Sequence, residues 1–372
     1  MSIAERLDGV IGRAIAEKRV VGCLVIAIRD GREIYNRAAG FADREAGVPV
    51  RQDTIFRLAS VTKPIVAATV LALVDRGALA LDAPVTDYLP WFAPKTENGA
   101  TPVITVRQLL SHSAGLAYGG QAFERAGITT GIEHSRLTLE DNIRRVATAP
   151  LLYPPGTGWA YSIAIDVLGA VIAEIEGTTL GAAVARYVTG PLGMADTAFI
   201  AVDPERLATA YGNAPGGAER MRVVHTMPNP WGTETTFLPG RILDPTAFHS
   251  GGGGMAGTAP DFAKLLLAFL DGGAPILSPE MARTAFVDQI PGIVRPDAPG
   301  SGFSTIGAIL RDPVVAGIPG SVGTVQWGGI YGNHWFVDPR AKFALVAFTN
   351  TAFEGSDGPF RFEIRDAAYP IG

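Results

Sequence analysis

The sequence Ser60-Val61-Thr62-Lys63, followed at once by an apolar run, places an amine one helical turn from a hydroxyl. Residues three apart share one face of a helix, so we expect Lys63 beside the Ser60 hydroxyl. A serine hydroxyl is a weak nucleophile at neutral pH until a base takes its proton, and a lysine can do so where burial or nearby positive charge lowers its pKa. A serine three residues before a lysine also occurs by chance, so this pair alone identifies a candidate and no more.

The composition is that of a globular protein with no electrostatic footprint for nucleic acid. The 372 residues carry a formal net charge of -5, and 47% of them are hydrophobic. Lysines and arginines form no dense cluster, so we expect no nucleic-acid partner. No apolar run approaches the roughly 18 residues that span a bilayer, so we expect no membrane segment.

The sequence lacks the usual signals for metal binding, disulfides and secretion. The single cysteine, Cys23, lies in an apolar stretch and fits a small buried side chain. The histidines are dispersed, with no H-E-x-x-H or C-x-x-C pattern, so we expect no metal site and no cofactor. The first residues lack the basic and apolar blocks of a secretory signal, which favours a cytoplasmic location.

The pattern of apolar residues predicts strands near both ends of the chain and helices between them. Helices are expected at 3–19 and 357–369, and strands at 20–28, 32–39, 303–310, 322–327, 330–337 and 342–348. From residue 60 to about 290 the pattern is mostly helical, with helix starts at Thr138-x-x-Asp141 and Thr258-x-x-Asp261. The stretch 213–241, rich in Pro, Gly and Thr, is expected to be a long irregular loop.

This order of elements predicts an α/β (α+β) fold in which one antiparallel sheet is built from both termini and flanked by helices. We expect residues 1–55 and 300–372 to form the domain that contains the sheet. Residues 56–299 are expected to form a mainly helical inserted domain, with the active site at the interface between the two.

Tyr161 is the second candidate for chemistry. It ends the turn-rich stretch Pro154-Pro155-Gly156-Thr157-Gly158-Trp159-Ala160-Tyr161 and stands just before an apolar helix. A tyrosine there can act as a phenolate base if a lysine stabilises it, or as an acid that returns the proton. The alternative is a packing residue whose hydroxyl is held by a hydrogen bond.

The third candidate is the strand junction Gln326-Trp327-Gly328-Gly329-Ile330-Tyr331-Gly332-Asn333. Paired glycines let a substrate lie against exposed backbone. A backbone amide there, together with the amide of Ser60, can form a two-donor oxyanion hole. A β-bulge or a hairpin corner is an equally good interpretation of the glycines alone.

Taken together and in this order, the three blocks resemble the serine β-lactamase and penicillin-binding-protein superfamily. Two further blocks resemble its class C branch: residues 106–116, which contain an L-L-x-H-x-S-G-L-like segment, and the glycine block with its following helix at 250–262. The resemblance implies a β-lactamase-like fold. Two motifs differ from the class C pattern. Class C enzymes carry K-T-G where this sequence has Trp327-Gly328-Gly329, and they carry Y-x-N where it has Tyr161-Ser162-Ile163. The W-G-G variant resembles the family VIII carboxylesterases.

The resemblance also implies a role for each residue. Ser60 is then the nucleophile, Lys63 its activating partner, and Tyr161 the base or acid linked to both. The residues implied for the rest of the site are the backbone amides of Ser60 and Ile330 as the oxyanion hole, and Tyr118, Trp327, Gly328 and Gly329 as substrate-binding residues. Whether Lys63 or Tyr161 is the general base stays open, because their titrations are coupled.

The function implied is a serine hydrolase that cleaves short-chain carboxylic esters through an acyl-serine intermediate, with a small-molecule ester as its substrate. Three alternatives remain: a β-lactamase, D-amino-acid peptidase or amidase; an acyltransferase on the same fold; and, more remotely, a non-catalytic binding protein. The G-x-S-x-G elbow of α/β-hydrolases is absent. A formal G-x-G-x-x-G match at Gly252, Gly254 and Gly257 lacks a βαβ setting and is interpreted as backbone packing. The oligomeric state is left open.

Overall fold

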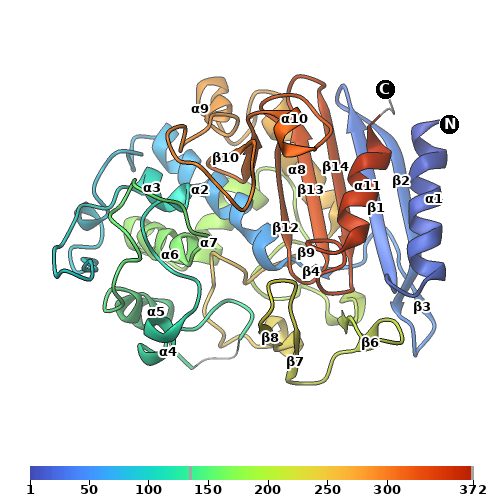
Figure 1. The fold of residues 1–372 in the computed structure, drawn as a ribbon, viewed down its shortest axis with the longest axis horizontal. Helices are drawn as coiled ribbons and strands as arrows, with labels where there is room; N and C mark the ends of the chain where they lie inside the picture. The colour runs from blue at the N-terminus through green and yellow to red at the C-terminus, as the bar shows by residue number, and fades with distance from the viewer. Residues whose placement is uncertain (134–135, 370–372) are drawn as a thin grey trace.

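The computed structural model describes residues 1–133 and 136–369, which build a large antiparallel sheet with helices packed on both of its faces (Figure 1). The sheet has eight strands in the order β10-β11-β12-β13-β14-β1-β2-β3. Their bounds are β1 Gly22–Arg29, β2 Arg32–Asp43, β3 Val48–Pro49, β10 Ser301–Phe303, β11 Ala308–Leu310, β12 Val325–Gly329, β13 Asn333–Asp338 and β14 Phe343–Thr349. The predicted sheet built from both ends of the chain is confirmed.

The two ends of the chain meet where β1 pairs with β14, with Leu24 opposite Phe348 and Ile26 opposite Val346. Both faces of these strands are buried, which explains their nearly continuous apolar sequences. One face packs on helices α1 (Ile3–Ala16) and α11 (Pro359–Ala368), and the other on α8 (Ala259–Leu270) (Figure 1).

Most of the remaining helices lie beside the sheet, around a central helix that is buried along most of its length. That helix is α2 (Thr62–Asp75), in which every residue from Thr62 to Leu73 is buried. The others are α3 Val106–Leu110, α4 Gln121–Arg125, α5 Leu139–Val146, α6 Ala164–Glu176, α7 Leu180–Val184, α9 Pro279–Thr284 and α10 Pro313–Ala316. An apolar helix buried on all sides is a rigid support for residues placed at its start. Ser60 and Lys63 stand at that start.

Most predicted elements are confirmed, including both helix starts. Thr138 and Asp141 form a complete capping box, and the Thr258 side chain accepts a hydrogen bond from the Asp261 amide. The single strand expected at 303–310 is wrong: β10 and β11 are separate strands, because a tight turn closed by the Ser304 amide and the Gly307 carbonyl reverses the chain. The division into two domains stays a prediction.

The expectation of an irregular loop at 213–241 is also wrong. The segment contains β6 (Glu219–Arg220), β7 (His225–Pro228) and β8 (Glu234–Phe237); β6 pairs with β5 (Tyr211–Gly212), and β7 pairs with β8. In β7 buried and exposed residues alternate, so a short period-two pattern was hidden among the prolines and glycines.

Among the described helices, none is by itself long and apolar enough to cross a membrane. Helix α6 and the segment Leu180–Thr189 pass that test only as a pair, with an 81° bend between them.

Candidate active site

Ser60 lies on a strained turn at the start of the central helix. The turn is the 3-10 segment Ala59–Val61, and α2 follows it directly. Ala59 has a φ of 45°, in the left-handed region that residues with a side chain rarely adopt. Such strain persists only where the surroundings hold it and is common at active sites. Leu58 and Val61, on either side, are fully buried and anchor the turn.

Lys63 lies against Ser60, as the helical spacing predicts. Its Nζ is 3.2 Å from the Ser60 Oγ and donates a second hydrogen bond, of 2.5 Å, to the Gly252 carbonyl. The side chain is only 4% exposed. Its ammonium lies over two aromatic rings, 5.1 Å from the Tyr118 centroid and 4.6 Å from the Tyr161 centroid. These contacts hold the amine in one place beside the hydroxyl.

Tyr161 reaches the same hydroxyl from another part of the chain. Its phenol oxygen is 2.7 Å from the Ser60 Oγ, and the Trp327 indole N–H donates to that phenol over 3.3 Å. The ring stacks on Tyr118, with centroids 5.3 Å apart, and lies 5.1 Å from Trp327. Ser60, Lys63 and Tyr161 therefore converge within hydrogen-bond reach, from the start of α2 and from the segment before α6. Their catalytic roles stay predictions.

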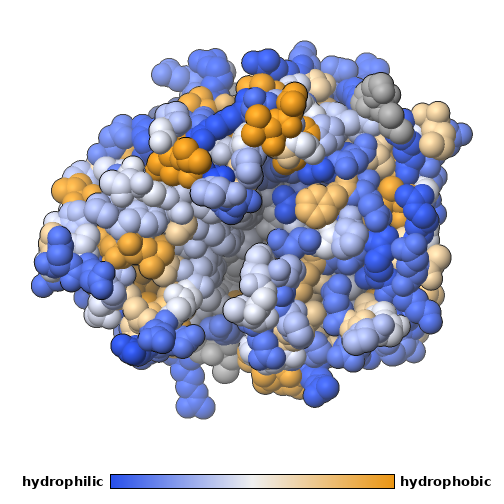
Figure 2. All heavy atoms as spheres, in the orientation of Figure 1, coloured by the Kyte–Doolittle hydropathy of each residue, from blue (hydrophilic) through white to orange (hydrophobic). Residues whose placement is uncertain are grey.

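The face that contains this region is hollowed. Figure 2 shows a groove between the helical part of the molecule and the sheet, where Figure 1 shows the start of α2 beside β12. Tyr118, Tyr161 and Trp327 are half-buried, so part of each residue remains accessible. This exposure fits the predicted role of Tyr118 and Trp327 as walls of a substrate site.

The turn after β12 packs directly on the nucleophile turn. A Cβ at Gly329 would lie 2.1 Å from the Leu58 carbonyl oxygen, so no side chain fits there. The Asn333 side-chain amide donates to the Arg57 carbonyl over 2.7 Å and ties the far end of the same turn to the segment before Ser60. The Ile330 carbonyl accepts from the Phe353 amide. These contacts fix the position of the backbone around Ile330, the predicted second oxyanion donor.

His112, in the L-L-x-H block, is a buried neutral residue behind Tyr161. Its ring is 4.9 Å from the Tyr161 ring, and Nδ1 is 3.1 Å from the Ser162 hydroxyl. Burial lowers the pKa of His112 well below its usual value, and the charges of Lys63 and Arg295 lower it further. The imidazole therefore supports the tyrosine and does not supply a proton at neutral pH.

Tyr118 is a neutral phenol. Burial raises the pKa of Tyr118 well above 10, and nearby Asp166 and Tyr161 raise it further. Its ring therefore contributes a π-face to Lys63 and a wall to the groove, and its hydroxyl keeps its proton.

Two contributors to the site were not predicted. The Gly252 carbonyl, which accepts from Lys63, lies in a glycine run that gave only a general signal of close packing. Asp166, a fully buried acid in the apolar helix α6, lies five residues after Tyr161. A carboxylate in an otherwise apolar helix is the signal that could have found it, because buried acids are rare without a partner.

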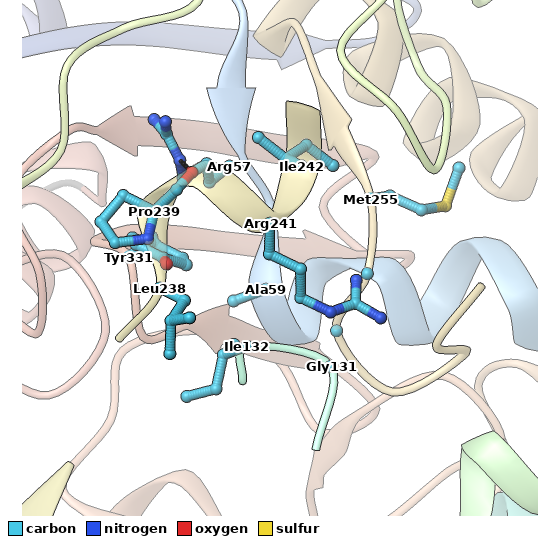
Figure 3. Close-up of a pocket in the computed structure, with 12 residues that line it drawn as sticks. Arg57, Ala59, Gly131, Ile132, Leu238, Pro239, Arg241, Ile242, Met255 and Tyr331 are labelled. Atoms are coloured by element: carbon cyan, nitrogen blue, oxygen red, sulfur yellow. Dashed lines mark hydrogen bonds between the residues drawn. The ribbon is translucent and has the colours of Figure 1, made fainter. Parts of the chain in front are cut away.

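A pocket opens beside the nucleophile turn (Figure 3). Its empty space, open solvent included, is about 260 Å³. Ile132, Leu238 and Tyr331 surround the Ala59 methyl group, and the Arg241 side chain closes another side (Figure 3). Arg241 donates to the Glu133 carbonyl over 3.0 Å and to the Phe248 carbonyl over 2.6 Å, which ties three loop segments together around the pocket.

The fold and these motifs define a member of the Beta-lactamase family, and the chain belongs to it: the family's model matches residues 7–369. The predicted superfamily is therefore confirmed. The chain is 46% identical to Esterase EstB of Burkholderia gladioli over 375 aligned positions, which cover 99% of this chain and 95% of the relative.

Solved structures agree with this assignment. The structure of EstCE1, described as a hydrolase with promiscuous acyltransferase activity, matches with a TM-score of 0.94 and 42% identity, over 99% of this chain and 98% of that one. D-amino acid amidase from Ochrobactrum anthropi matches with a TM-score of 0.72 at 22% identity, over 98% of this chain and 97% of that one, and shows the shared fold alone.

Proposed function

We propose that this chain is a serine carboxylesterase of the family VIII type that cleaves short-chain esters through an acyl-serine at Ser60. One observation carries the proposal: the Ser60 Oγ is within hydrogen-bond reach of both the Lys63 amine and the Tyr161 phenol. The similarity to Esterase EstB supports esters as the substrate class. A chain that keeps all three groups in contact is difficult to explain as a non-catalytic binding protein.

The proposed reaction has two steps. In the first, the Lys63–Tyr161 pair takes the Ser60 proton, Oγ attacks the ester carbonyl carbon, and the backbone amides of Ser60 and Ile330 stabilise the oxyanion. The C–O bond to the alcohol then breaks, and the pair returns the proton to the departing oxygen. In the second step, water loses a proton to the same pair and attacks the acyl carbon, the bond from that carbon to the Ser60 Oγ breaks, and the pair returns the proton to Oγ as the acid leaves. No cofactor is required.

The substrate-binding residues favour neutral acyl and alcohol groups. Trp327 occupies the position of the lysine in K-T-G, so that strand offers no cation to a substrate carboxylate. Tyr118 and Trp327 present aromatic faces, and the absence of side chains at Gly328 and Gly329 lets this strand end pack closely beside the Ser60 turn. A β-lactam carries a carboxylate, whereas a simple ester does not, so esters are the better match.

Acyl transfer to an alcohol is the second candidate, since the similar protein EstCE1 is a hydrolase with promiscuous acyltransferase activity. It uses the same acyl-serine and differs only in whether water or an alcohol reaches it. The cytoplasm is the proposed location, and the division at residues 55–56 and 299–300 is the proposed domain boundary.

We expect p-nitrophenyl butyrate to be hydrolysed with a kcat/KM roughly 10- to 100-fold above that for a chromogenic cephalosporin, because the cephalosporin carboxylate lacks a charged partner here. Parallel initial rates on the purified protein measure this ratio, with a class C β-lactamase as the positive control for the cephalosporin. Faster turnover of the cephalosporin would reverse the substrate ranking. Adding an alcohol acceptor and quantifying the new ester tests the second candidate.

Gly329→Ala is expected to lower kcat roughly 10- to 100-fold, since the added methyl group pushes the Ile330 backbone away from the Ser60 turn and misplaces an oxyanion donor. Gly12→Ala in α1 is the matched control, because a Cβ there meets no atom within 4 Å. The measurement is kcat with p-nitrophenyl butyrate on folded variants. Equal kcat in Gly329→Ala and wild type would remove this turn from the oxyanion hole.

A further inference from the structure

A buried carboxylate lies behind Lys63 and has no part in the proposed reaction. Asp166 is 1% exposed, in the first turn of α6. Its Oδ1 accepts a hydrogen bond of 2.5 Å from the Ser250 hydroxyl, and its Oδ2 lies against Gly252, where no hydrogen bond of standard geometry forms in the described part of the chain but the Gly252 N–H still lowers the pKa of the carboxyl. Burying a carboxylate is costly unless neighbouring groups stabilise it, so its presence here needs a reason.

The carboxylate supports the peptide that holds Lys63. A Cβ added at Gly252 would lie 2.2 Å from the Asp166 Oδ2 and 3.0 Å from the Tyr118 hydroxyl, so Gly252 is wedged between these two side chains. The carbonyl of that same glycine accepts the 2.5 Å hydrogen bond from the Lys63 Nζ. The Gly254 amide closes the turn by donating to the Ser250 carbonyl. Asp166 and Ser250 thus anchor the loop that orients the amine.

The same residues also interact electrostatically. Burial raises the pKa of Asp166, whereas the Ser250 hydroxyl, the positive charge of Lys63, the Gly252 N–H and the charge of Arg241 all lower it. Burial is the largest of these effects, so the pKa of Asp166 is raised overall, and the four interactions oppose that rise by favouring the ionised carboxylate. In the described part of the chain, neither Lys63 nor Arg241 forms an ion pair within 4.0 Å, and the charges of both act on Asp166 without direct contact.

Two other titratable groups around Lys63, Tyr118 and His112, are neutral at pH 7. Tyr118 and His112 face it, and burial holds the pKa of Tyr118 well above 10 and that of His112 well below its usual value. Tyr161, the remaining neighbour, belongs to the proton-transfer pair itself. Glu133 is a further acid near this group, and its charge raises the pKa of Tyr118. Asp166 is therefore the acid that most directly balances the charge of Lys63.

We infer that Asp166 is a positioning residue of the proposed esterase: it fixes the Gly252 carbonyl under Lys63 and places a carboxylate behind the Lys63–Tyr161 pair. The inference rests on the proposed acyl-serine reaction. Removing the charge lets the pair lose its proton more easily, so the pair becomes competent as a base at lower pH.

The test is the pH dependence of kcat/KM for p-nitrophenyl butyrate in Asp166→Asn, with spontaneous hydrolysis subtracted. We expect kcat to fall about 10-fold and the acid limb of the profile to move to lower pH by about one pH unit, the size expected for removing one nearby charge from a buried site. If Asp166 has only a structural role, Asp166→Asn lowers kcat and the acid limb of the pH profile stays at the same pH. Asp261→Asn is the matched control: it also removes a buried acid, but one bonded to Asp196 and Thr197.

Ser250→Ala decides the question if Asp166→Asn does not fold. Loss of the hydroxyl raises the pKa of Asp166 and weakens its charge, so a smaller shift of the acid limb in the same direction is expected. An unmoved limb in a folded and active variant of either kind overturns the inference. Failure of the wild type to show any Ser60-dependent ester turnover would instead overturn the proposed function, and the two outcomes are distinct.

Discussion

Ser60→Ala is expected to lower kcat for p-nitrophenyl butyrate by about 10,000-fold or more. Without Oγ no acyl-enzyme forms, and loss of the nucleophile in comparable serine hydrolases removes nearly all catalysis beyond that of the binding site itself. The methyl group that remains fits the turn, because the Ser60 side chain is half-buried and Leu58 and Val61 anchor the backbone. Stopped-flow and steady-state rates give kcat, and circular dichroism verifies the fold.

The control for Ser60→Ala is Ser111→Ala, which also removes a serine hydroxyl from the buried interior. The Ser111 hydroxyl bonds to the Arg107 carbonyl and to the Ser113 hydroxyl, away from Lys63 and Tyr161. Its kcat should stay within about three-fold of the wild type. A fluorophosphonate probe should label the wild type and Ser111→Ala at residue 60, and should leave Ser60→Ala unlabelled. Ester turnover undiminished in Ser60→Ala would end the acyl-serine proposal.

Sequence predicts those contacts in the site that depend only on local helix geometry. Ser60 and Lys63 meet because residues three apart share a helix face, and this holds wherever the helix packs. The apolar pattern of the terminal segments likewise predicts a buried sheet, and the pairing of β1 with β14 confirms it. Tyr161 is different. Its approach to Ser60 across 101 residues was inferred from resemblance and could not follow from spacing.

The missed features depend on tertiary contacts. Gly252 lies 189 residues from Lys63, and nothing in a run of glycines says which carbonyl will meet an amine. The three short strands in 213–241 were hidden because strands of two to four residues carry too few alternations to stand out from turn residues. Asp166 was visible as a charge in an apolar helix, but its relation to Lys63 passes through the Ser250 loop, which only the folded chain brings near.

Lys63→Met is expected to lower kcat about 1,000-fold or more with little loss of stability. Methionine has a similar length and is apolar, so it can fill the space beside the stacked Tyr118 and Tyr161 rings that the lysine side chain now occupies. The variant removes the amine that contacts the Ser60 Oγ and leaves Tyr161 as the only candidate base. Lys264→Met, at a half-exposed ion pair with Asp261 on α8, is the control and should keep kcat within about three-fold.

The pH profile of Lys63→Met distinguishes the two roles that the coupled pair leaves open. If the lysine is itself the base, Tyr161 cannot replace it and kcat stays low at every pH. If Lys63 acts by stabilising a Tyr161 phenolate, loss of its positive charge makes the phenol harder to ionise, so activity should partly return as the pH rises toward 10 or above. Lys63→Met/Tyr161→Phe is the reference for this recovery, because it has no ionisable group left in the pair. A kcat for Lys63→Met within 10-fold of wild type at neutral pH would contradict both roles, since the 3.2 Å contact between Nζ and Oγ would then contribute nothing to proton transfer.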